Sequence, residues 1–331
     1  MTGAWGVSKQ TLASSARDLM CDPVDILIVA GTWDVRCLSM VEVQWERPVP
    51  RVLLVKYANS GKSGRARSYT DLLLEHFSAE SSARVSDISI DSSNLVAAWS
   101  DMKAAVLDAY VEVGRPIRIG LDITSVPRYV WLNLLGYAAE TGVIAGFEFV
   151  YTAAHEYEYV DGPRIFSDGV WKPRAIATLG RGAQPSAESL LVVSGGFEGA
   201  NTLRLVNALE PDRVLVALSS SQSIEHDRDA RRANAPLAQE YGLAGEVIDF
   251  PLSDVSTSVA NLDRALGALE RGPSRELAIS FLLCGSKISA LVIGLYAIRR
   301  DIAQIYFSDP QYRLETTASS IEWITCVSVN L

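Results

Sequence analysis

The sequence is poor in the side chains that most often hold metals or form disulfides. It contains four cysteines and three histidines among 331 residues, and no two cysteines form a C-x-x-C pair. The cysteines lie far apart in the chain, at Cys21, Cys37, Cys284 and Cys326. We therefore expect neither a thiolate metal site nor a disulfide framework, and a reducing cytoplasm is the expected setting.

Positive charge and an apolar leader are also lacking. The formal net charge is −9 at pH 7, which argues against general binding to duplex DNA or RNA but leaves room for a local basic pocket. The first 22 residues contain no apolar core of the kind that a secretory signal needs, so we do not expect export.

Long apolar runs are equally scarce, and only residues 278–298 would pass a length test for a membrane span. Lys287 is the only charge in this stretch, and Gly285 and Ser286 precede it near the middle. A charge at the centre of a bilayer is costly, and a buried strand followed by a buried helix has the same hydropathy. We predict a strand, a tight turn and a helix here, with no membrane contact.

What the sequence does contain is a regular alternation of short apolar runs and segments with helical periodicity. Hydrophobic residues make up 48% and charged residues 21%, so the chain has enough apolar surface to fold. Each half contains five runs that predict strands. They are residues 25–30, 51–57, 85–90, 117–122 and 147–152, then 190–194, 213–218, 246–250, 277–283 and 302–307. Repeated strand-helix-strand units form parallel sheets through right-handed crossovers, so we predict an α/β fold with two tandem Rossmann-like units.

The predicted organisation has four parts. A polar lead with a possible short helix covers residues 1–23, and a first Rossmann-like unit covers residues 24–152. The regular alternation stops in a connecting segment, residues 153–188, and a second Rossmann-like unit covers residues 189–331. β-Branched residues alternate between positions 319 and 329, which is compatible with an additional edge strand.

The two halves share a strand-to-helix turn that carries a cation. When residues 135–138 are aligned with residues 294–297, Arg128 falls on Lys287 and Ser125 falls on Cys284. Ligands of open α/β sheets bind at the carboxyl ends of strands, and the first amides of a helix favour an anion. We predict two similar units related by an approximate twofold axis, each with a cation at this turn.

These turns also carry hydroxyl groups and a carboxylate. The residues in question are Asp122, Thr124, Ser125 and Arg128 in the first half and Gly285, Ser286 and Lys287 in the second. Hydroxyls and a guanidinium at a helix start can clamp an anion. In the alternative interpretation, Thr124 or Ser125 only caps the helix, Arg128 pairs with Asp122, and Lys287 extends to solvent.

The loops after the first strand of each half form a second pair of candidates. They contain Thr32, Trp33, Asp34 and Arg36 in the first half and Gly196, Phe197 and Glu198 in the second. The aromatic residue could stack on a base while the acid contacts a ribose, or it could cover the sheet while the acid caps a helix. Neither loop contains G-x-G-x-x-G, so we expect no nicotinamide or flavin cofactor.

Two further features are candidate sites of chemistry. Residues 59–64 (NSGKSG) follow a strand, but Lys56 stands where a phosphate-binding loop requires glycine, so a basic surface loop is favoured over nucleoside-triphosphate hydrolysis. His155 is the only histidine near a predicted strand end, and hence the only candidate for imidazole acid-base chemistry.

Two tandem Rossmann-like halves with hydroxyl-plus-cation turns resemble the CRISPR-associated Rossmann-fold (CARF) sensors. They resemble still more the fused SAVED domains of antiphage systems, over residues 25–312. The resemblance implies that a cyclic oligonucleotide lies in the cleft between the halves, held by the turns at Arg128 and Lys287. No effector domain is recognised in the sequence, so the resemblance implies that an output comes from a partner protein or another subunit.

Two other classes of function stay open. In an enzyme acting on a nucleotide or phosphosugar, Asp34, Asp122 or Glu198 would be the acid-base group. In a scaffold subunit of a defence complex, the halves would only bind a partner. We favour a sensor that binds a nucleotide-type small molecule and performs no chemistry.

Overall fold

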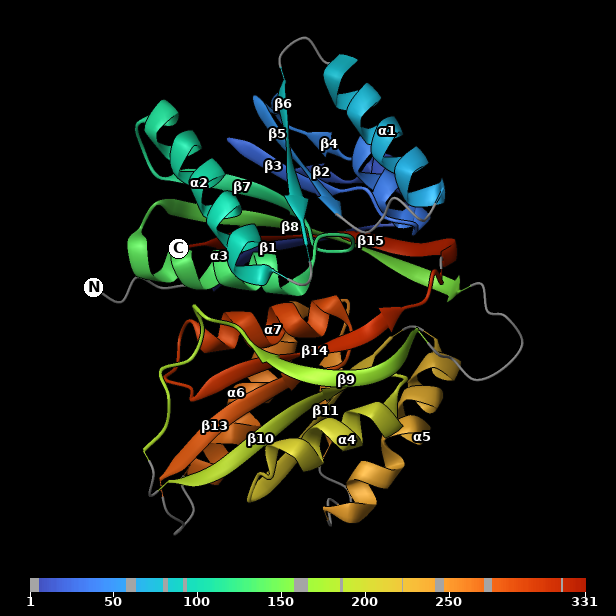
Figure 1. Cartoon of the computed structure of the whole chain (residues 1–331), viewed down its shortest axis with the longest axis vertical. Coiled ribbons are helices and arrows are strands. Elements are labelled where there is room, and N and C mark those ends of the chain that lie inside the picture. Colours follow the sequence, from blue (N-terminus) through green and yellow to red (C-terminus); the bar gives the residue numbers. More distant parts are fainter. Residues whose placement is uncertain are drawn as a thin grey trace. The chain divides into compact units, whose positions relative to one another are not determined.

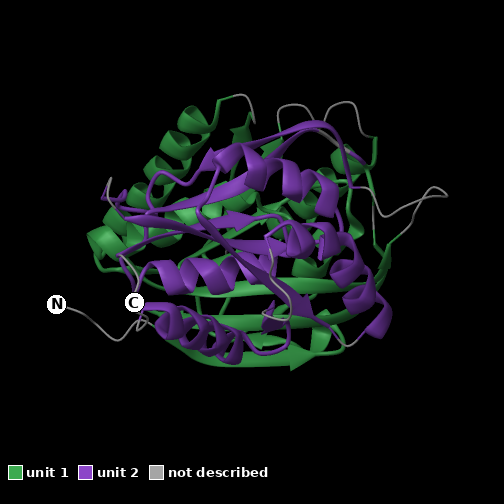
Figure 2. Ribbon diagram, turned by 90° about the horizontal axis from the view of Figure 1, so that it is seen from below, with its two compact units in different colours: residues 1–159, 315–331 green, residues 160–314 purple. Residues whose placement is uncertain are grey.

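The computed structural model describes residues 6–57, 64–79, 83–91, 94–157, 166–184, 187–221, 223–241, 247–270, 276–316 and 318–331 (Figure 1). The chain forms two compact α/β units, which Figure 2 shows in different colours. Unit 1 comprises Met1–Tyr159 and Glu315–Leu331, and unit 2 comprises Val160–Leu314. The candidate phosphate loop, residues 59–64, lies outside the described residues except for Gly64.

Unit 1 contains a seven-stranded sheet in the order β1-β15-β8-β7-β3-β5-β6. The strands are β1 (Gly6–Ala13), β3 (Ile26–Ala30), β5 (Arg51–Tyr57), β6 (Arg84–Ile90), β7 (Ile117–Asp122), β8 (Ile144–Tyr157) and β15 (Ala318–Asn330). The five strands from β8 to β6 are parallel, whereas β15 and β1 are antiparallel additions. The buried β3 lies at the centre of the parallel part, which explains its continuous apolar sequence.

The helices of unit 1 cover both faces of this sheet. They are the 3-10 helices η1 (Ala16–Asp18) and η2 (Val35–Val41) and the α-helices α1 (Gly64–Ala79), α2 (Leu95–Val113) and α3 (Arg128–Thr141). Helix α1 packs against η2, and α2 packs against α3. Two short strands, β2 (Met20–Cys21) and β4 (Gln44–Trp45), form a separate parallel pair. Gly114 and Gly142 end α2 and α3 in the left-handed conformation that glycine adopts most easily.

Unit 2 contains a six-stranded sheet in the order β12-β11-β10-β13-β14-β9. The strands are β9 (Ser167–Ala175), β10 (Glu188–Gly195), β11 (Arg213–Ser220), β12 (Val247–Pro251), β13 (Leu277–Leu283) and β14 (Gln304–Arg313). All neighbours are parallel except β9, which pairs antiparallel with β14. The helices are α4 (Gly199–Leu209), α5 (Ile224–Glu240), α6 (Val255–Glu270) and α7 (Lys287–Ala297). Helix α4 packs against α5, and α6 packs against α7.

The two units have the same strand order. When the parallel strands of each unit are numbered along the chain, both sheets read third, second, first, fourth, fifth. An antiparallel strand then follows the fifth strand in each unit, β15 beside β8 and β9 beside β14. The prediction of two Rossmann-like α/β units is therefore confirmed at the level of topology.

The structure divides the chain differently from the predicted four parts. The lead, for which only a possible short helix is predicted, contains β1, which pairs with β15. The start of the connecting segment, residues 153–157, continues β8, and the same segment also contains β9 of unit 2. Residues 315–331 belong to unit 1 instead of the second unit, because β15 fills the sheet position beside β8.

Unit 2 is thus inserted into a β-hairpin of unit 1. Tyr157 of β8 pairs with Ala318 of β15, so the chain leaves unit 1 and re-enters it at neighbouring positions. In unit 2 the same holds for Ser167 of β9 and Arg313 of β14, which pair with one another. Both segments that connect the two units therefore begin and end at strands that are paired with one another within each unit.

The stretch that passed a length test for a membrane span forms β13, the turn and α7. Helix α7 has only 11 residues, and each one from Ile288 to Ala297 is buried, which accounts for its high hydropathy. Among the described residues, no helix is both long and apolar enough to cross a membrane.

Candidate ligand-binding sites at the strand ends

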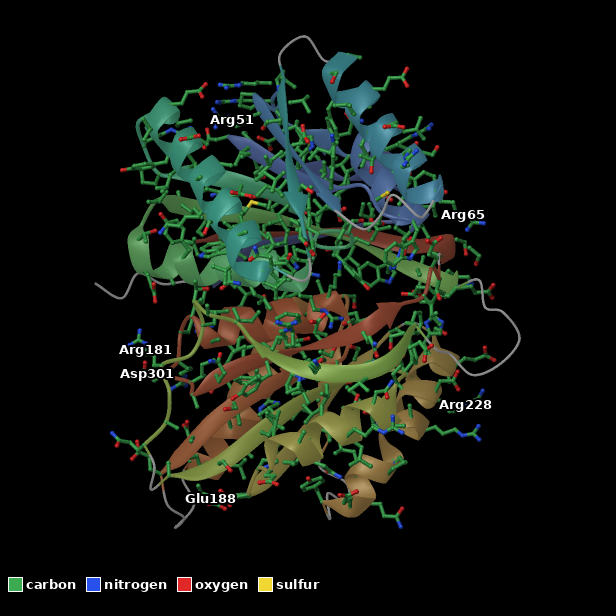
Figure 3. The ribbon with its side chains drawn as sticks, viewed as in Figure 1. Arg51, Arg65, Arg181, Glu188, Arg228 and Asp301 are labelled. Atoms are coloured by element: carbon green, nitrogen blue, oxygen red, sulfur yellow. The ribbon has the colours of Figure 1, made fainter. Side chains whose placement is uncertain are left out.

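In unit 1, β3 and β7 mark the point where the strand order reverses. The chain leaves β3 toward β5 and returns at β7 on the other side of β3. Open α/β sheets bind ligands outside the carboxyl ends of the strands at such a point. The loop after β3 and the turn after β7, both selected from the sequence, lie at this edge. Figure 3 marks the two ends of β5, which neighbours β3 in the sheet. Arg51 begins β5 at its amino end, and Arg65 lies at the start of α1, which follows the carboxyl end of β5.

The loop after β3 is organised by an ion pair between Asp34 and Arg36. The Arg36 Nη2 atom lies 2.6 Å from Oδ2 of Asp34, and its Nε atom lies 3.1 and 3.0 Å from the two carboxylate oxygens. Asp34 also caps η2, because its Oδ1 atom accepts a hydrogen bond from the Arg36 backbone N–H at 3.0 Å. Thr32 is buried and its hydroxyl accepts from the Asp34 N–H, while Trp33 is half-buried. The capping role considered for the acid is therefore present at Asp34.

Arg36 also ties this loop to β8. Its Nη1 atom donates to the Thr152 carbonyl oxygen at 3.1 Å, and its guanidinium lies 5.3 Å from the centre of the Tyr157 ring. Burial opposes the positive charge, but the nearby Tyr157 and Asp34 raise the pKa of Arg36 above its ordinary value. Arg36 thus stays charged, and its N–H groups already donate hydrogen bonds to Asp34 and to the Thr152 carbonyl oxygen.

The turn after β7 is held by Asp122 and Thr124. The Thr124 N–H donates to Oδ1 of Asp122 at 2.8 Å, and the Thr124 hydroxyl accepts from the Thr152 N–H at 2.9 Å. Both side chains are buried. They fix the turn to β8 and do not cap α3, so the capping alternative does not describe Thr124.

Arg128 is the first residue of α3, as the alignment with Lys287 predicted. The N-cap position is occupied by Pro127, and no side chain among the described residues caps this helix. Ser125 lies two residues before the cap and is 4% exposed, and its Oγ atom makes no hydrogen bond within the described part of the chain. The start of α3 therefore combines amide groups that no side chain caps with a guanidinium and a buried hydroxyl.

Two tyrosines complete the unit 1 site. Tyr57 at the end of β5 donates its phenol proton to the Ser125 carbonyl oxygen at 2.8 Å. Burial and the nearby Tyr157 raise the pKa of Tyr151 to about 12, although Arg36 and Arg128 act in the opposite direction. Tyr151 is therefore a neutral phenol at physiological pH.

The corresponding edge of unit 2 brings two loops into backbone contact. A Cβ atom at Gly196 would lie 2.7 Å from the Cys284 carbonyl oxygen, and one at Gly285 would lie 2.7 Å from the Gly195 carbonyl oxygen. Only glycine fits at these distances, which explains why both loops contain it. In Figure 3, Glu188 marks the amino end of β10 and Arg228 lies early in α5, at the carboxyl edge of this sheet.

The aromatic residue and the acid of the unit 2 loop contact the start of β9. Phe197 stacks against Phe166 at 6.0 Å between ring centres and meets the His226 ring at 5.9 Å. The Glu198 Oε1 atom accepts from the Ser167 hydroxyl at 2.6 Å and from the Phe166 N–H at 3.3 Å. The packing interpretation considered for this aromatic residue is therefore present at Phe197.

Ser286 belongs to a cluster of three serine hydroxyls. Its Oγ atom lies 2.6 Å from that of Ser289 and 3.2 Å from that of Ser219, and the last two are 2.7 Å apart. Ser286 also caps α7 by accepting from the Ser289 N–H at 3.1 Å. Lys287 is half-buried and is the first residue of α7. Ser286 thus caps its helix, which the alternative interpretation had considered only for Thr124 or Ser125 at the other turn.

The candidate residues come together within each unit, but several of their neighbours escaped prediction. Tyr151, Ser219 and Ser289 are not among the predicted residues, although Ser219 lies near the carboxyl end of β11, where a ligand would bind. His155 lies on β8 and is exposed. Within the described ranges, no three His, Cys, Asp or Glu side chains are arranged to hold a metal ion.

Comparison with known proteins adds a likeness to solved structures alone. No protein-family model and no curated protein match the chain. The crystal structure of the cytoplasmic domain of a prokaryotic cation chloride cotransporter is 10% identical, with a TM-score of 0.25, over 86% of this chain and 95% of that one. An adenylation, ketoreductase and pseudo Asub multidomain structure of a keto acid-selecting NRPS module is 11% identical, with a TM-score of 0.22. That match covers 88% of this chain and 33% of the other. At these TM-scores the likeness carries no argument about function.

Proposed function

We propose that the chain is a sensor subunit that binds a nucleotide-type ligand at the strand ends of its Rossmann-like units. The observation that carries the proposal is the start of α3. There Arg128 enters a helix that no described side chain caps, and the buried Ser125 hydroxyl makes no hydrogen bond to the described residues. A phosphate group would accept from amides, a hydroxyl and a guanidinium at such a helix start.

The two units would contribute differently to phosphate binding. In unit 2, Ser286 already satisfies the Ser289 N–H, so fewer amides of α7 are open to an anion. Lys287 would then act mainly as a point charge beside the three serine hydroxyls. We expect the larger contribution to phosphate affinity from Arg128.

The carboxylates favour a sensor over an enzyme. Asp34 is committed to Arg36, Glu198 to Ser167 and the Phe166 N–H, and the Oδ1 atom of Asp122 to the Thr124 N–H. A general base needs a carboxylate within reach of the substrate proton, and these three already serve as structural acceptors. We extend the proposal, on the resemblance noted in the sequence, to a cyclic oligonucleotide as ligand, a role in antiphage defence and an effector protein as partner.

The proposal is tested by calorimetric titration with a panel of mononucleotides and of cyclic dinucleotides, trinucleotides and tetranucleotides. Arg128→Ala and Lys287→Ala should each weaken binding by about 1.5 to 3 kcal/mol, the range for a charge-assisted hydrogen bond, with the larger loss in Arg128→Ala. The control is Arg181→Ala, because Arg181 pairs with Asp301 on the exposed surface of unit 2, as Figure 3 shows. It should leave affinity unchanged.

Two outcomes of these titrations would contradict the proposal. If no nucleotide binds, or if Arg128→Ala binds as the wild type does, the start of α3 is not the phosphate site. A double variant of Arg128 and Lys287 tests whether the two cations act on one ligand, because non-additive losses indicate a shared ligand. If Lys287→Ala greatly lowers the melting temperature but leaves the affinity for the nucleotide unchanged, Lys287 has a structural role.

A further inference from the structure

The end of β8 in unit 1 and the start of β9 in unit 2 are each held by side-chain contacts. Residues 158–165 connect β8 of unit 1 to β9 of unit 2. Tyr157 is the last residue of β8, and Phe166 and Ser167 stand at the start of β9. Each of these ends is contacted by the candidate ligand loop of its own unit.

In unit 1 the contact comes from Arg36, in the loop after β3. Its guanidinium covers the Tyr157 ring at 5.3 Å and donates to the Thr152 carbonyl oxygen at 3.1 Å. Its position is set by the contacts of Nε and Nη2 with Asp34. A buried guanidinium fixed in this way loses little freedom when it stacks on a ring, so the end of β8 is held firmly.

In unit 2 the contact comes from Phe197 and Glu198, in the loop after β10. Phe197 stacks on Phe166, and the Glu198 carboxylate accepts from the Phe166 N–H and the Ser167 hydroxyl. The Ser167 hydroxyl oxygen in turn accepts from the Trp171 indole N–H at 2.8 Å. Hydrogen bonds to a carboxylate are stronger than neutral ones, so Glu198 is the principal anchor at this end.

From these paired contacts we infer that Arg36 and Glu198 are positioning residues that couple the candidate ligand loops to the end of β8 and the start of β9. A ligand that engages either loop would change how firmly the corresponding end is held. The ligand-dependent part of this inference rests on the proposed function. It supplies that function with an output, because the occupied and empty loops would hold the end of β8 and the start of β9 with different strength.

The anchoring is tested without ligand by hydrogen exchange and mass spectrometry on the full chain. Glu198→Gln keeps the size of the side chain but removes the charge, and Ser167→Ala removes one donor. Both should raise exchange in the peptide of residues 166–175 by about fivefold, as expected from losing part of a charge-assisted hydrogen bond. Exchange in residues 213–220 of β11 should not change, which excludes general unfolding of unit 2.

Glu270→Gln is the matched control, because Glu270 is exposed at the end of α6 and thus lies away from the carboxyl ends of the strands. It should leave exchange in residues 166–175 at the wild-type rate. Unchanged exchange in that peptide in both Glu198→Gln and Ser167→Ala would overturn the anchoring. An equal rise in residues 213–220 would overturn it too, since the effect would then be general.

The coupling is tested with whichever nucleotide of the titration panel binds. It should lower exchange in residues 150–157 and 166–175 of the wild type. In Glu198→Gln the change at residues 166–175 should disappear while that at residues 150–157 remains, a pattern that a merely structural glutamate would not produce. Binding without any change at either end would overturn the coupling and leave the proposed function standing. A panel without any binder would overturn the proposed function and the coupling together, and the ligand-free result would still decide the anchoring.

Discussion

Replacing Arg36 with alanine would leave the Asp34 carboxylate in a partly buried site without its counter-ion. The two side chains are only 11% and 16% exposed, and their charged atoms approach to 2.6 Å. Removing one member of a buried ion pair costs about 3 to 5 kcal/mol, because the remaining charge has lost its partner and cannot be fully hydrated. The variant also loses the bond to the Thr152 carbonyl and the contact with Tyr157, so we expect the upper part of this range.

Urea denaturation followed by tryptophan fluorescence would measure this loss. All tryptophans except Trp171 belong to unit 1, so the signal reports mainly on the unit that contains Arg36. The double variant of Asp34 and Arg36 should cost less than the sum of the single variants by about 1 to 3 kcal/mol, because it removes both charges. The matched control is Arg17→Ala, whose partner Glu42 lies in the same unit but at the surface. It should cost less than about 1 kcal/mol.

Three results would refute this reasoning. A loss below about 1 kcal/mol for Arg36→Ala would mean that the pair is hydrated like a surface pair. Fully additive single and double variants would mean that the two side chains do not depend on each other. A strong dependence of the loss on salt concentration would also mean that the pair is exposed, because buried pairs are screened much less than exposed ones.

Three further predictions concern titration and reactivity. Burial raises the pKa of Tyr151 to about 12, so the unfolded chain releases this proton at lower pH than the folded one, and stability falls as the pH rises from 10 to 12. Tyr151→Phe should reduce that fall by up to about 1.4 kcal/mol per pH unit in denaturation curves, and an unchanged slope would contradict the assignment. The Thr257 hydroxyl and N–H lower the pKa of Asp254, whose stabilisation is therefore present above the ordinary pKa of aspartate and lost as the pH falls below it. Asp254→Ala should cost at most about 1 kcal/mol at pH 7 and less near pH 3, and an equal cost at both values would argue against a charged cap. Cys284 is partly exposed, whereas burial raises the pKa of the Cys37 thiol to about 12. Iodoacetamide should therefore label Cys284 first in the folded protein, as read by peptide mass spectrometry, and faster labelling of Cys37 would contradict its burial.

The sequence by itself determined most of the elements and the class of fold. The predicted bounds of β5, β7 and β13 agree with the structure, because each is a local apolar run whose length is that of a buried strand. The alignment that paired Arg128 with Lys287 also held, since both residues begin their helices. The turns before them differ in length, five residues after Asp122 and three after Leu283. Their hydroxyl groups consequently do not correspond one to one.

Only the tertiary structure decided what is distant in the chain. Ser8 donates to the Ser328 carbonyl across 320 positions, so β1 exists as a strand because β15 offers it an edge. The return of the last residues to unit 1 depends on the same kind of pairing, which local periodicity does not encode. The roles of Arg36 and Glu198 were hidden for a related reason. A charged residue after a strand has the same local pattern whether it faces a ligand or holds a neighbouring strand, and only the folded chain shows which partners lie within reach.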